Sequence, residues 1–207
     1  MNGARFITLE GGDGAGKSTQ ARLLAGALEG QGHEVLLTRE PGGTAGAEAI
    51  RTLLLDPGLS WNAAAEALLF AAARADHVAA AIRPALMRGA FVVCDRFLDS
   101  SRAYQGGAGG LADADLLALH RIGSAGLLPD LTLLLHLPPA EAAVRADMRD
   151  GGEADAIGGR GVTYHAAVTA GFARLAEKEP DRFSTIDASG TPAQVHARIL
   201  AAVLERA

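Results

Sequence analysis

The chain is poor in cysteine and lacks long apolar runs. Cys94 is the only cysteine among 207 residues, so no intrachain disulfide can form and a reducing compartment is expected. Cys94 lies in an apolar run, where an inert core residue is expected. No stretch of about 18 apolar residues is free of charge, and only Met1 to Ala4 precede the first apolar run. We therefore expect neither a membrane span nor a signal peptide, and the predicted location is cytoplasmic.

Positive charge is also scarce. The sequence holds 19 Lys and Arg against 24 Asp and Glu, a formal net charge of −5, and it has no block of basic residues. This balance argues against nucleic-acid binding as the main role, although it is compatible with a local positive pocket for a mononucleotide. Aromatic residues make up 4% and hydrophobic residues 49% of the chain. The length and apolar content predict a single domain over residues 1–207 with one substantial core.

The chain does contain a phosphate-binding motif. Residues Gly11 to Ser18 read GGDGAGKS, which fits the P-loop pattern G-x-x-x-x-G-K-[ST]. The β-prone run from Phe6 to Glu10 precedes it, and apolar residues at helical spacing follow it. Glycines let successive backbone N–H groups point at an anion, while Lys17 supplies a charge for the outer phosphates and Ser18 a hydroxyl for Mg²⁺. The alternative is a glycine-rich turn that binds nothing, but motif and context agree.

Short apolar runs alternate with longer helical patterns along the chain. The alternation is typical of βαβ units and predicts an α/β fold, with a parallel sheet covered by helices on both faces. Such sheets bind ligands beyond the carboxyl ends of their strands, so residues 11–18, 39–44 and 95–105 are expected on one rim. The predicted strands are Arg5–Glu10, Glu34–Thr38, Ala90–Cys94, Leu131–Leu137 and Phe183–Asp187. The predicted helices are Lys17–Glu29, Ala45–Leu55, Ala63–Arg88, Asp113–Gly123, Ala140–Met148, Tyr164–Glu179 and Pro192–Arg206.

Three glycine-rich segments interrupt this pattern: Gly42-Gly43, Gly106–Gly110 and Asp150–Gly161. The third is too polar and too rich in glycine to be core, and it separates two predicted helices. It predicts a mobile lid, with a disordered surface loop as the alternative. The six histidines are scattered without metal-ligand spacing, so they are interpreted as structural or surface residues.

Four further segments accompany the P-loop. They read TREPGGT from Thr38, LFAAAR from Leu69, DRFLDSS from Asp95 and AYQGG from Ala103. Together with the P-loop they resemble bacterial thymidylate kinase, a family of P-loop nucleoside monophosphate kinases, from Phe6 to about Leu204. The combination is specific, whereas each of the four segments alone is weak. The resemblance implies a P-loop kinase fold with a five-stranded parallel sheet and a lid. It also implies transfer of the γ-phosphoryl group of ATP to dTMP, giving dTDP for dTTP synthesis.

On the ATP side, the resemblance implies that the P-loop backbone and Lys17 hold the phosphates. Ser18 and Asp95 are implied to lie at Mg²⁺, which is held mainly by phosphates and water. Arg96 is implied to clamp phosphates with its planar fork; the alternative for Asp95 and Arg96 is a surface salt bridge. The implied ATP-binding residues are Gly11, Gly12, Asp13, Gly14, Ala15, Gly16, Lys17, Ser18, Thr19 and Arg145.

On the acceptor side, Asp13 is implied to face the sugar 3′-hydroxyl of dTMP and Arg39 its phosphate, with a plain turn as the alternative for Arg39. Phe70 and Arg74 are four residues apart and share a helix face. They are implied to stack on thymine and to reach its carbonyl edge, although core packing is the better reading of Phe70 taken alone. The other implied dTMP contacts are Arg96, Ser101, Tyr104, which crowds the 2′ position of the sugar, and Gln105.

The lid is where the sequence departs from the family pattern. Gly14 stands where some members carry a P-loop arginine, and the other class of the family places its catalytic arginines in the lid, here about residues 145–161. Arg145 and Arg149 match that class, with helix solubilisation as the alternative. The usual Asp-Arg pair is missing because Ala156 follows Asp155, so Arg160, between glycines, is expected to take over. Lys17, Asp95, Arg96, Arg149 and Arg160 are thus the implied catalytic residues.

Two other functions stay open at this point. One is another nucleoside monophosphate kinase of the same fold, against which Phe70, Arg74 and residues 95–105 argue. The other is a nucleotide-binding switch that turns over no small acceptor, which would need neither the Phe70 and Arg74 pair nor an arginine-bearing lid. The resemblance also implies a homodimer, for which the alanine-rich stretch Ala63–Arg88 could supply the interface.

Overall fold

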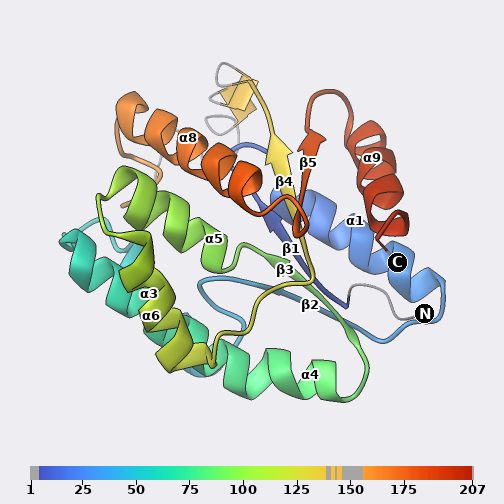
Figure 1. Ribbon diagram of the computed structural model, residues 1–207, viewed down its shortest axis with the longest axis horizontal. Helices are drawn as coiled ribbons and strands as arrows, with labels where there is room; N and C mark the ends of the chain where they lie inside the picture. The colour runs from blue at the N-terminus through green and yellow to red at the C-terminus, as the bar shows by residue number, and fades with distance from the viewer. Residues whose placement is uncertain (1–4, 139–140, 143, 146–155, 207) are drawn as a thin grey trace.

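Five parallel strands form the centre of the molecule (Figure 1). The computed structural model describes residues 5–138, 141–142, 144–145 and 156–206. Every pair of neighbouring strands is parallel, and the register sets both Leu9 and Arg39 opposite Asp95. The carboxyl ends of the strands therefore meet along one edge. In sheet order the strands are β2 (Val35–Arg39), β3 (Phe91–Asp95), β1 (Phe6–Glu10), β4 (Leu131–His136) and β5 (Phe183–Asp187).

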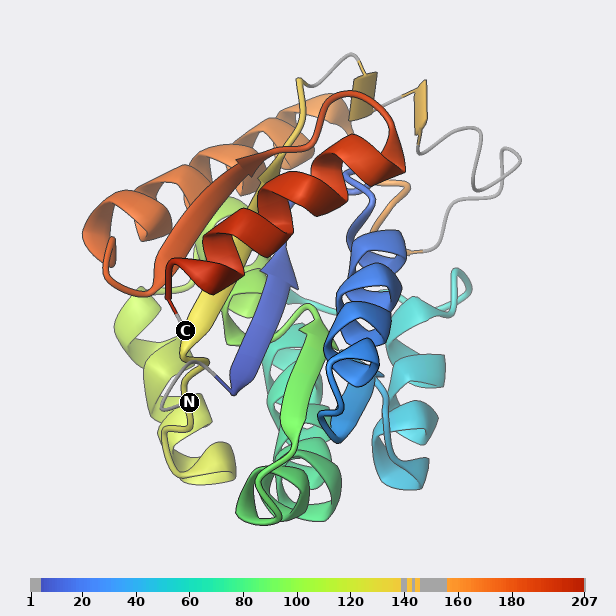
Figure 2. The same cartoon turned by 90° about the vertical axis from the view of Figure 1, so that its right-hand side faces the viewer.

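Helices cover both faces of the sheet (Figure 2). On one face lie α1 (Lys17–Gly30) and α9 (Pro192–Leu204). The other face carries α3 (Ala63–His77), the π-helical turn η1 (Val78–Ile82), α4 (Arg83–Met87), α5 (Leu98–Ser101), the π-helical turn η2 (Arg102–Ala108), α6 (Asp113–Ser124) and α8 (Val162–Lys178). Helix α2 (Ala45–Leu55) packs against α3. Among the described residues, no helix combines the length and apolar character needed to cross a bilayer.

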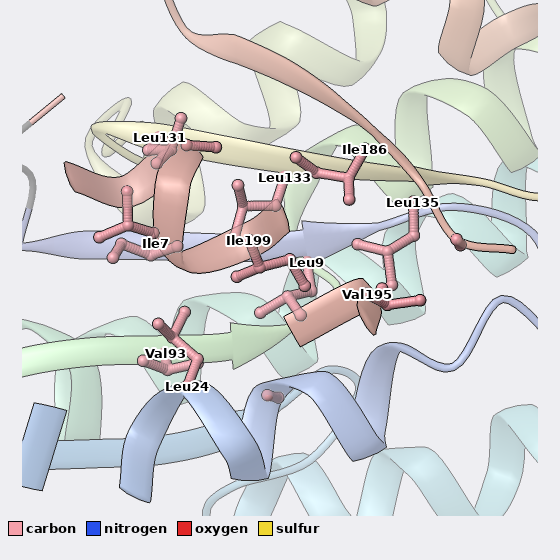
Figure 3. Packing of buried hydrophobic residues seen from close by; sticks show 14 of the residues in the cluster. Ile7, Leu9, Leu24, Val93, Leu131, Leu133, Leu135, Ile186, Val195 and Ile199 are labelled. Carbon is pink, nitrogen blue, oxygen red and sulfur yellow. The ribbon is translucent and has the colours of Figure 1, made fainter. Parts of the chain in front are cut away.

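Side-chain alternation along the strands divides the core into layers. In β1, Ile7 and Leu9 face α1 and α9, and they pack with Leu24 and Ile199 (Figure 3). Phe6 points to the other face, where it meets Phe97 edge-on at 4.9 Å between ring centroids. Because all five residues of β1 are buried, the strand that leads into the P-loop is held from both sides.

Capping residues fix where several helices begin. The Thr44 and Asn62 side chains accept hydrogen bonds from the backbone N–H groups of Ala47 and Ala65, respectively. Thr191 and Gln194 form a capping box at the start of α9. These caps set the ends of the loops that border the carboxyl edge of the sheet.

Apart from shifts of one or two residues at element ends, the structure departs from the predicted elements in two regions, residues 63–88 and residues 98–108. The predicted helix Ala63–Arg88 is interrupted by η1, a wider turn within the helical run. Gly106 and Gly107, expected to interrupt the pattern, belong to η2. Gly107 packs closely against α8, because a Cβ on it would lie 3.2 Å from the Cα of Gly171. The predicted helix Ala140–Met148 lies partly outside the described residues.

Candidate functional site

A cleft of about 890 Å³ opens at the carboxyl edge of the sheet. The P-loop forms its floor, between β1 and α1. Arg39 from the end of β2 and Asp95 from the end of β3 line one side, and Phe70 from α3 lies further along. Arg145 and Gly190 line the other side. Segments far apart in the sequence thus meet where a parallel sheet is expected to bind its ligand.

Two P-loop glycines are required by the backbone. Gly11 has φ +136°, and a Cβ there would lie 2.5 Å from the carbonyl oxygen of Leu135. Gly16 has φ +88° and immediately precedes α1. A side chain at either position would strain the loop, so the tight turn that aims the N–H groups at the cleft depends on glycine.

Lys17 is held inside this turn. Its Nζ donates to the carbonyl of Gly12 at 2.8 Å, and its side chain lines the cleft. Burial lowers the pKa of Lys17 to about 8, and the positive charge of Arg96 adds to the effect. The ammonium group therefore lacks a full complement of anionic partners, which a polyphosphate would supply.

We expect nucleotide binding to take up a proton at alkaline pH. An anion next to Lys17 raises its pKa above the value of about 8 in the free protein, so binding should recruit about half a proton at pH 8 and about 0.9 proton at pH 9. Affinity for ATP should correspondingly fall as pH rises above 8. Calorimetry in buffers of different ionisation enthalpy measures the uptake. An arginine at position 17 does not titrate, so Lys17→Arg should bind without it; equal uptake by both proteins would contradict the assignment.

One carboxylate oxygen of Asp95 has no hydrogen-bond partner among the described residues. Ser18 Oγ donates to Asp95 Oδ2, whereas Asp95 Oδ1 is buried and accepts no hydrogen bond from any described residue. Such an orphaned carboxylate oxygen beside a hydroxyl fits the oxygen ligands that Mg²⁺ prefers. The predicted pair Ser18 and Asp95 is therefore brought together at the mouth of the P-loop. No cluster of three or more His, Cys, Asp or Glu side chains suited to a metal occurs in the described part of the chain.

Arg96 occupies a strained backbone position. Its backbone φ is +68°, a left-handed conformation that non-glycine residues adopt only rarely. From there its guanidinium donates to Asp13 Oδ1 at 2.6 Å and to the Gly11 carbonyl at 3.1 Å. It also lies over the Tyr104 ring at 5.1 Å and donates to the Tyr104 hydroxyl at 3.2 Å. The side chain thus ties the P-loop to the segment that follows β3.

Glu10 supports this strained turn, although sequence reasoning did not single it out. Its carboxylate accepts from the Phe97 N–H at 2.8 Å and from Ser100 Oγ at 2.6 Å. Ser100 Oγ in turn accepts from Arg96 at 3.1 Å. Burial raises the pKa of Glu10 to about 7, with the charge of Asp99 adding to the rise. A charged residue at the end of a mostly apolar strand was the signal available in the sequence.

Arg74 lies behind the cleft wall rather than among the residues that line it. Its Nε donates to Glu40 Oε2 at 2.7 Å, and one Nη donates to Ser101 Oγ at 2.8 Å. Glu40 also meets His77 Nδ1 at 3.0 Å, and His77 Nε2 lies 2.7 Å from Thr38 Oγ1. This buried network fixes the Arg74 guanidinium next to Ser101. Arg74 and Ser101, which were each predicted to contact dTMP, therefore contact each other, and neither lines the cleft.

The other residues predicted to bind dTMP differ in how exposed their side chains are. Phe70, Tyr104 and Gln105 line the cleft, and the Gln105 carboxamide donates to Glu66 at 2.7 Å. Arg39 also lines the cleft, but its side chain is 55% exposed and pairs with Glu48 at 3.0 Å. The structure thus groups the aromatic and amide side chains at one end, with Arg39 at the rim.

The predicted lid arginines lie in different surroundings. Arg145 lines the cleft and donates to the carbonyls of Ala188 at 3.1 Å and Gly190 at 3.5 Å. Arg160 pairs with Glu66 and lies over the Tyr164 ring at 4.8 Å, and it is not among the residues that line the cleft. Arg149 lies outside the described residues.

Similarity to known proteins extends over nearly the whole chain. A family model described as thymidylate kinase matches residues 9–199. The chain belongs to the thymidylate kinase family. The thymidylate kinase of Rhizorhabdus wittichii is 57% identical over 202 residues, covering 97% of both chains. That of Gluconobacter oxydans is 53% identical over 205 residues, covering 97% of this chain and 94% of the other.

A solved structure bears out the fold. The crystal structure of thymidylate kinase from Ehrlichia chaffeensis superposes with a TM-score of 0.78 at 33% identity, over 98% of this chain and 99% of that one. The prediction of an α/β P-loop kinase fold with a five-stranded parallel sheet is confirmed. Within the thymidylate kinase fold of this chain, sequence reasoning missed three buried residues that hold predicted site residues in place: Glu10, Glu40 and Glu66.

Proposed function

We propose that this chain transfers the γ-phosphoryl group of ATP to dTMP, giving ADP and dTDP. The observation that carries the proposal is the single cleft joining a phosphate-binding P-loop to a pocket end lined by Phe70 and Gln105. Phosphoryl transfer needs both substrates aligned and their charge neutralised, with little covalent chemistry from the protein. One continuous cleft supports that alignment.

At the phosphate end, the proposed donors are the backbone N–H groups of the P-loop, Lys17 and Arg96. Their charges offset the negative charge that spreads over the transferring group. Ser18 and Asp95 would hold Mg²⁺, which would supply positive charge to offset the charge of the phosphate oxygens. Arg145, beside the carbonyls of Ala188 and Gly190, would flank the ATP base.

At the acceptor end, Phe70 would stack on the thymine ring. Arg74 and Ser101 lie behind the cleft wall, so their side chains would have to reach past it to contact the carbonyl edge. Asp13, held by Arg96 at 2.6 Å, would accept a hydrogen bond from the sugar 3′-hydroxyl. Arg39 would meet the dTMP phosphate after leaving Glu48 at the exposed rim. Tyr104, buried against Arg96, would close the space beside the sugar 2′ carbon.

The domain organisation, location and partners of the chain belong to the same proposal. We propose one kinase domain over residues 1–207 with a lid at about 145–161, acting in the cytoplasm without nucleic-acid or membrane partners. A homodimer through Ala63–Arg88 stays a prediction. It is supported by apolar side chains at the surface of the packed helices α3 and α6, where Leu68 is 56% and Ile122 is 77% exposed.

An acceptor panel tests the proposed function. ADP formation from ATP is measured with dTMP, dUMP, dCMP, AMP, CMP and GMP at equal concentrations. The proposal expects dTMP to give the highest kcat/KM. Preference for AMP, CMP or GMP would assign another nucleoside monophosphate kinase. ATP binding without turnover of any acceptor would favour a nucleotide-binding switch.

We expect dUMP to be a measurable but poor acceptor. It lacks only the 5-methyl group of thymine, and one missing methyl in an apolar pocket lowers kcat/KM by roughly 10–200-fold. Steady-state kinetics with both nucleotides measure the ratio, and dTMP assayed in the presence of dUMP controls for inhibition. Equal kcat/KM values would contradict a pocket shaped around the methyl group.

Arginine variants of the lid separate the two catalytic candidates. An arginine that contacts the transferring group is worth about 10³–10⁵ in rate. Because Glu66 and Tyr164 hold Arg160, its catalytic role requires release from both. We therefore expect Arg149→Ala to lower kcat by at least about 10³ and Arg160→Ala to have the smaller effect. Single-turnover phosphoryl transfer is the measurement. The opposite order would assign the catalytic role to Arg160.

A further inference from the structure

Glu66 is a buried carboxylate shared by the base end of the cleft and the end of the lid. It lies in the first turn of α3, one helical turn before Phe70, and is 3% exposed. Its Oε1 accepts from Gln105 Nε2 at 2.7 Å. Arg160 donates to both carboxylate oxygens, to Oε1 at 3.3 Å. Glu66 itself does not line the cleft, whereas Phe70 and Gln105 do.

The contact with Glu66 fixes which way the Gln105 carboxamide faces. An ionised carboxylate only accepts hydrogen bonds, so the Gln105 NH₂ group must point at it. The carboxamide oxygen is then the side-chain atom left for the cleft. No described residue donates a hydrogen bond to it. Arg160 donates to both carboxylate oxygens and so holds Glu66 in place, because a buried carboxylate needs a paired partner.

We propose that Glu66 is the positioning residue that selects the pyrimidine class. By holding the Gln105 carboxamide oxygen toward the cleft, it makes the pocket accept a base with an N3–H donor. Thymine and uracil carry that donor, whereas cytosine carries an acceptor at N3. This inference rests on the proposed function, because it takes the Phe70 and Gln105 end of the cleft as the base pocket.

Glu66→Gln tests the inference, because a glutamine at position 66 can donate as well as accept. The Gln105 carboxamide is then free to flip and to present its NH₂ group to cytosine. We expect the ratio of the dissociation constants of dCMP and dTMP to fall about tenfold. The ratio for dUMP and dTMP should stay within about twofold, since these two bases share the N3–H group. The KM for dTMP should rise more than kcat falls.

The dCMP/dTMP and dUMP/dTMP ratios of dissociation constants distinguish a positioning role of Glu66 from a general disturbance of the pocket. A variant that merely disturbs the pocket would change discrimination against both dUMP and dCMP, and that result would overturn the proposal. An unchanged dCMP ratio would overturn it as well. Glu34→Gln is the matched control, since Glu34 forms an exposed pair with Arg88 at 3.1 Å and both ratios should be unaffected. Wild-type protein that fails to prefer dTMP would refute the proposed function instead, before any variant is compared.

Two further variants keep the test decisive. Gln105→Met keeps the side-chain length but removes the amide, so it should lower the dCMP discrimination, and adding Glu66→Gln should then have no further effect. Should Glu66→Gln fold poorly because Arg160 loses its partner, the double variant Glu66→Gln with Arg160→Gln removes the uncompensated charge. Undiminished dCMP discrimination in the Gln105→Met variant would contradict the assignment.

Discussion

Lys17→Ala is expected to lower kcat/KM for ATP by about 10²–10³. The substitution removes the ammonium group that faces the cleft beside Gly12, and the backbone N–H groups alone then hold the outer phosphates. The loss should appear in kcat as well as in KM, because charge on the transferring group increases toward the transition state. Coupled measurement of ADP formation with saturating dTMP gives both constants.

The chain offers a matched control for this variant. Lys178 is the only other lysine, and it forms an exposed pair with Asp113 at 3.4 Å, its side chain 67% exposed. Lys178→Ala should leave both constants within about twofold of wild type, as surface pairs contribute little. A Lys17→Ala enzyme that keeps more than about a tenth of the wild-type activity would contradict the role given to the P-loop lysine.

Arg96→Gln is expected to lower kcat by about 10²–10³. The wild-type guanidinium joins Asp13 to Tyr104 and the Gly11 carbonyl, so both the phosphate and the sugar ends of the cleft depend on it. Glutamine keeps a polar side chain on the left-handed backbone but has neither the charge nor the fork. Single-turnover phosphoryl transfer and circular dichroism distinguish lost chemistry from lost folding.

Arg96→Lys adds a second comparison. Lysine restores the charge as a point donor but not the planar arrangement of the contacts with Asp13 and Tyr104. We expect it to recover only part of the lost rate. Arg88→Gln, which removes an exposed arginine paired with Glu34, should behave as wild type. Full activity of Arg96→Lys would mean that charge alone suffices, contrary to the geometry described for the guanidinium.

The strand positions were predictable from the sequence because burial on both faces leaves a clear mark. The fully buried strand β1 reads FITLE, with one polar residue before the closing Glu10. The edge strand β5 is only partly buried, yet it also has the predicted bounds Phe183–Asp187. The helical turns after β3 were not predictable in the same way. Gly106 and Gly107 have low helix propensity, yet they lie in η2, where a Cβ would lie 3.1 Å from Leu116 of α6 and 3.2 Å from Gly171 of α8, respectively.

Motif spacing predicted which residues gather at the site but not how they are held. The P-loop, Asp95 and Arg96 follow strands that end at one edge, so their proximity follows from the parallel sheet. The buried carboxylates Glu40 and Glu66 contact residues 34 and 39 positions away. Patterns of neighbouring residues in the sequence do not reveal contacts between residues so far apart in the chain. For the same reason, the pairing of Arg160 with Glu66 was visible only in the structure.

A crystal structure with dTMP and a non-hydrolysable ATP analogue tests the central claim most directly. We predict the triphosphate on the P-loop N–H groups and Lys17, the thymine ring stacked on Phe70, and the dTMP phosphate between the ATP end and Arg39. The Gln105 carboxamide oxygen should face the thymine N3–H. A complex in which the Phe70 end of the cleft stays empty, or holds the adenine of ATP, would contradict the account.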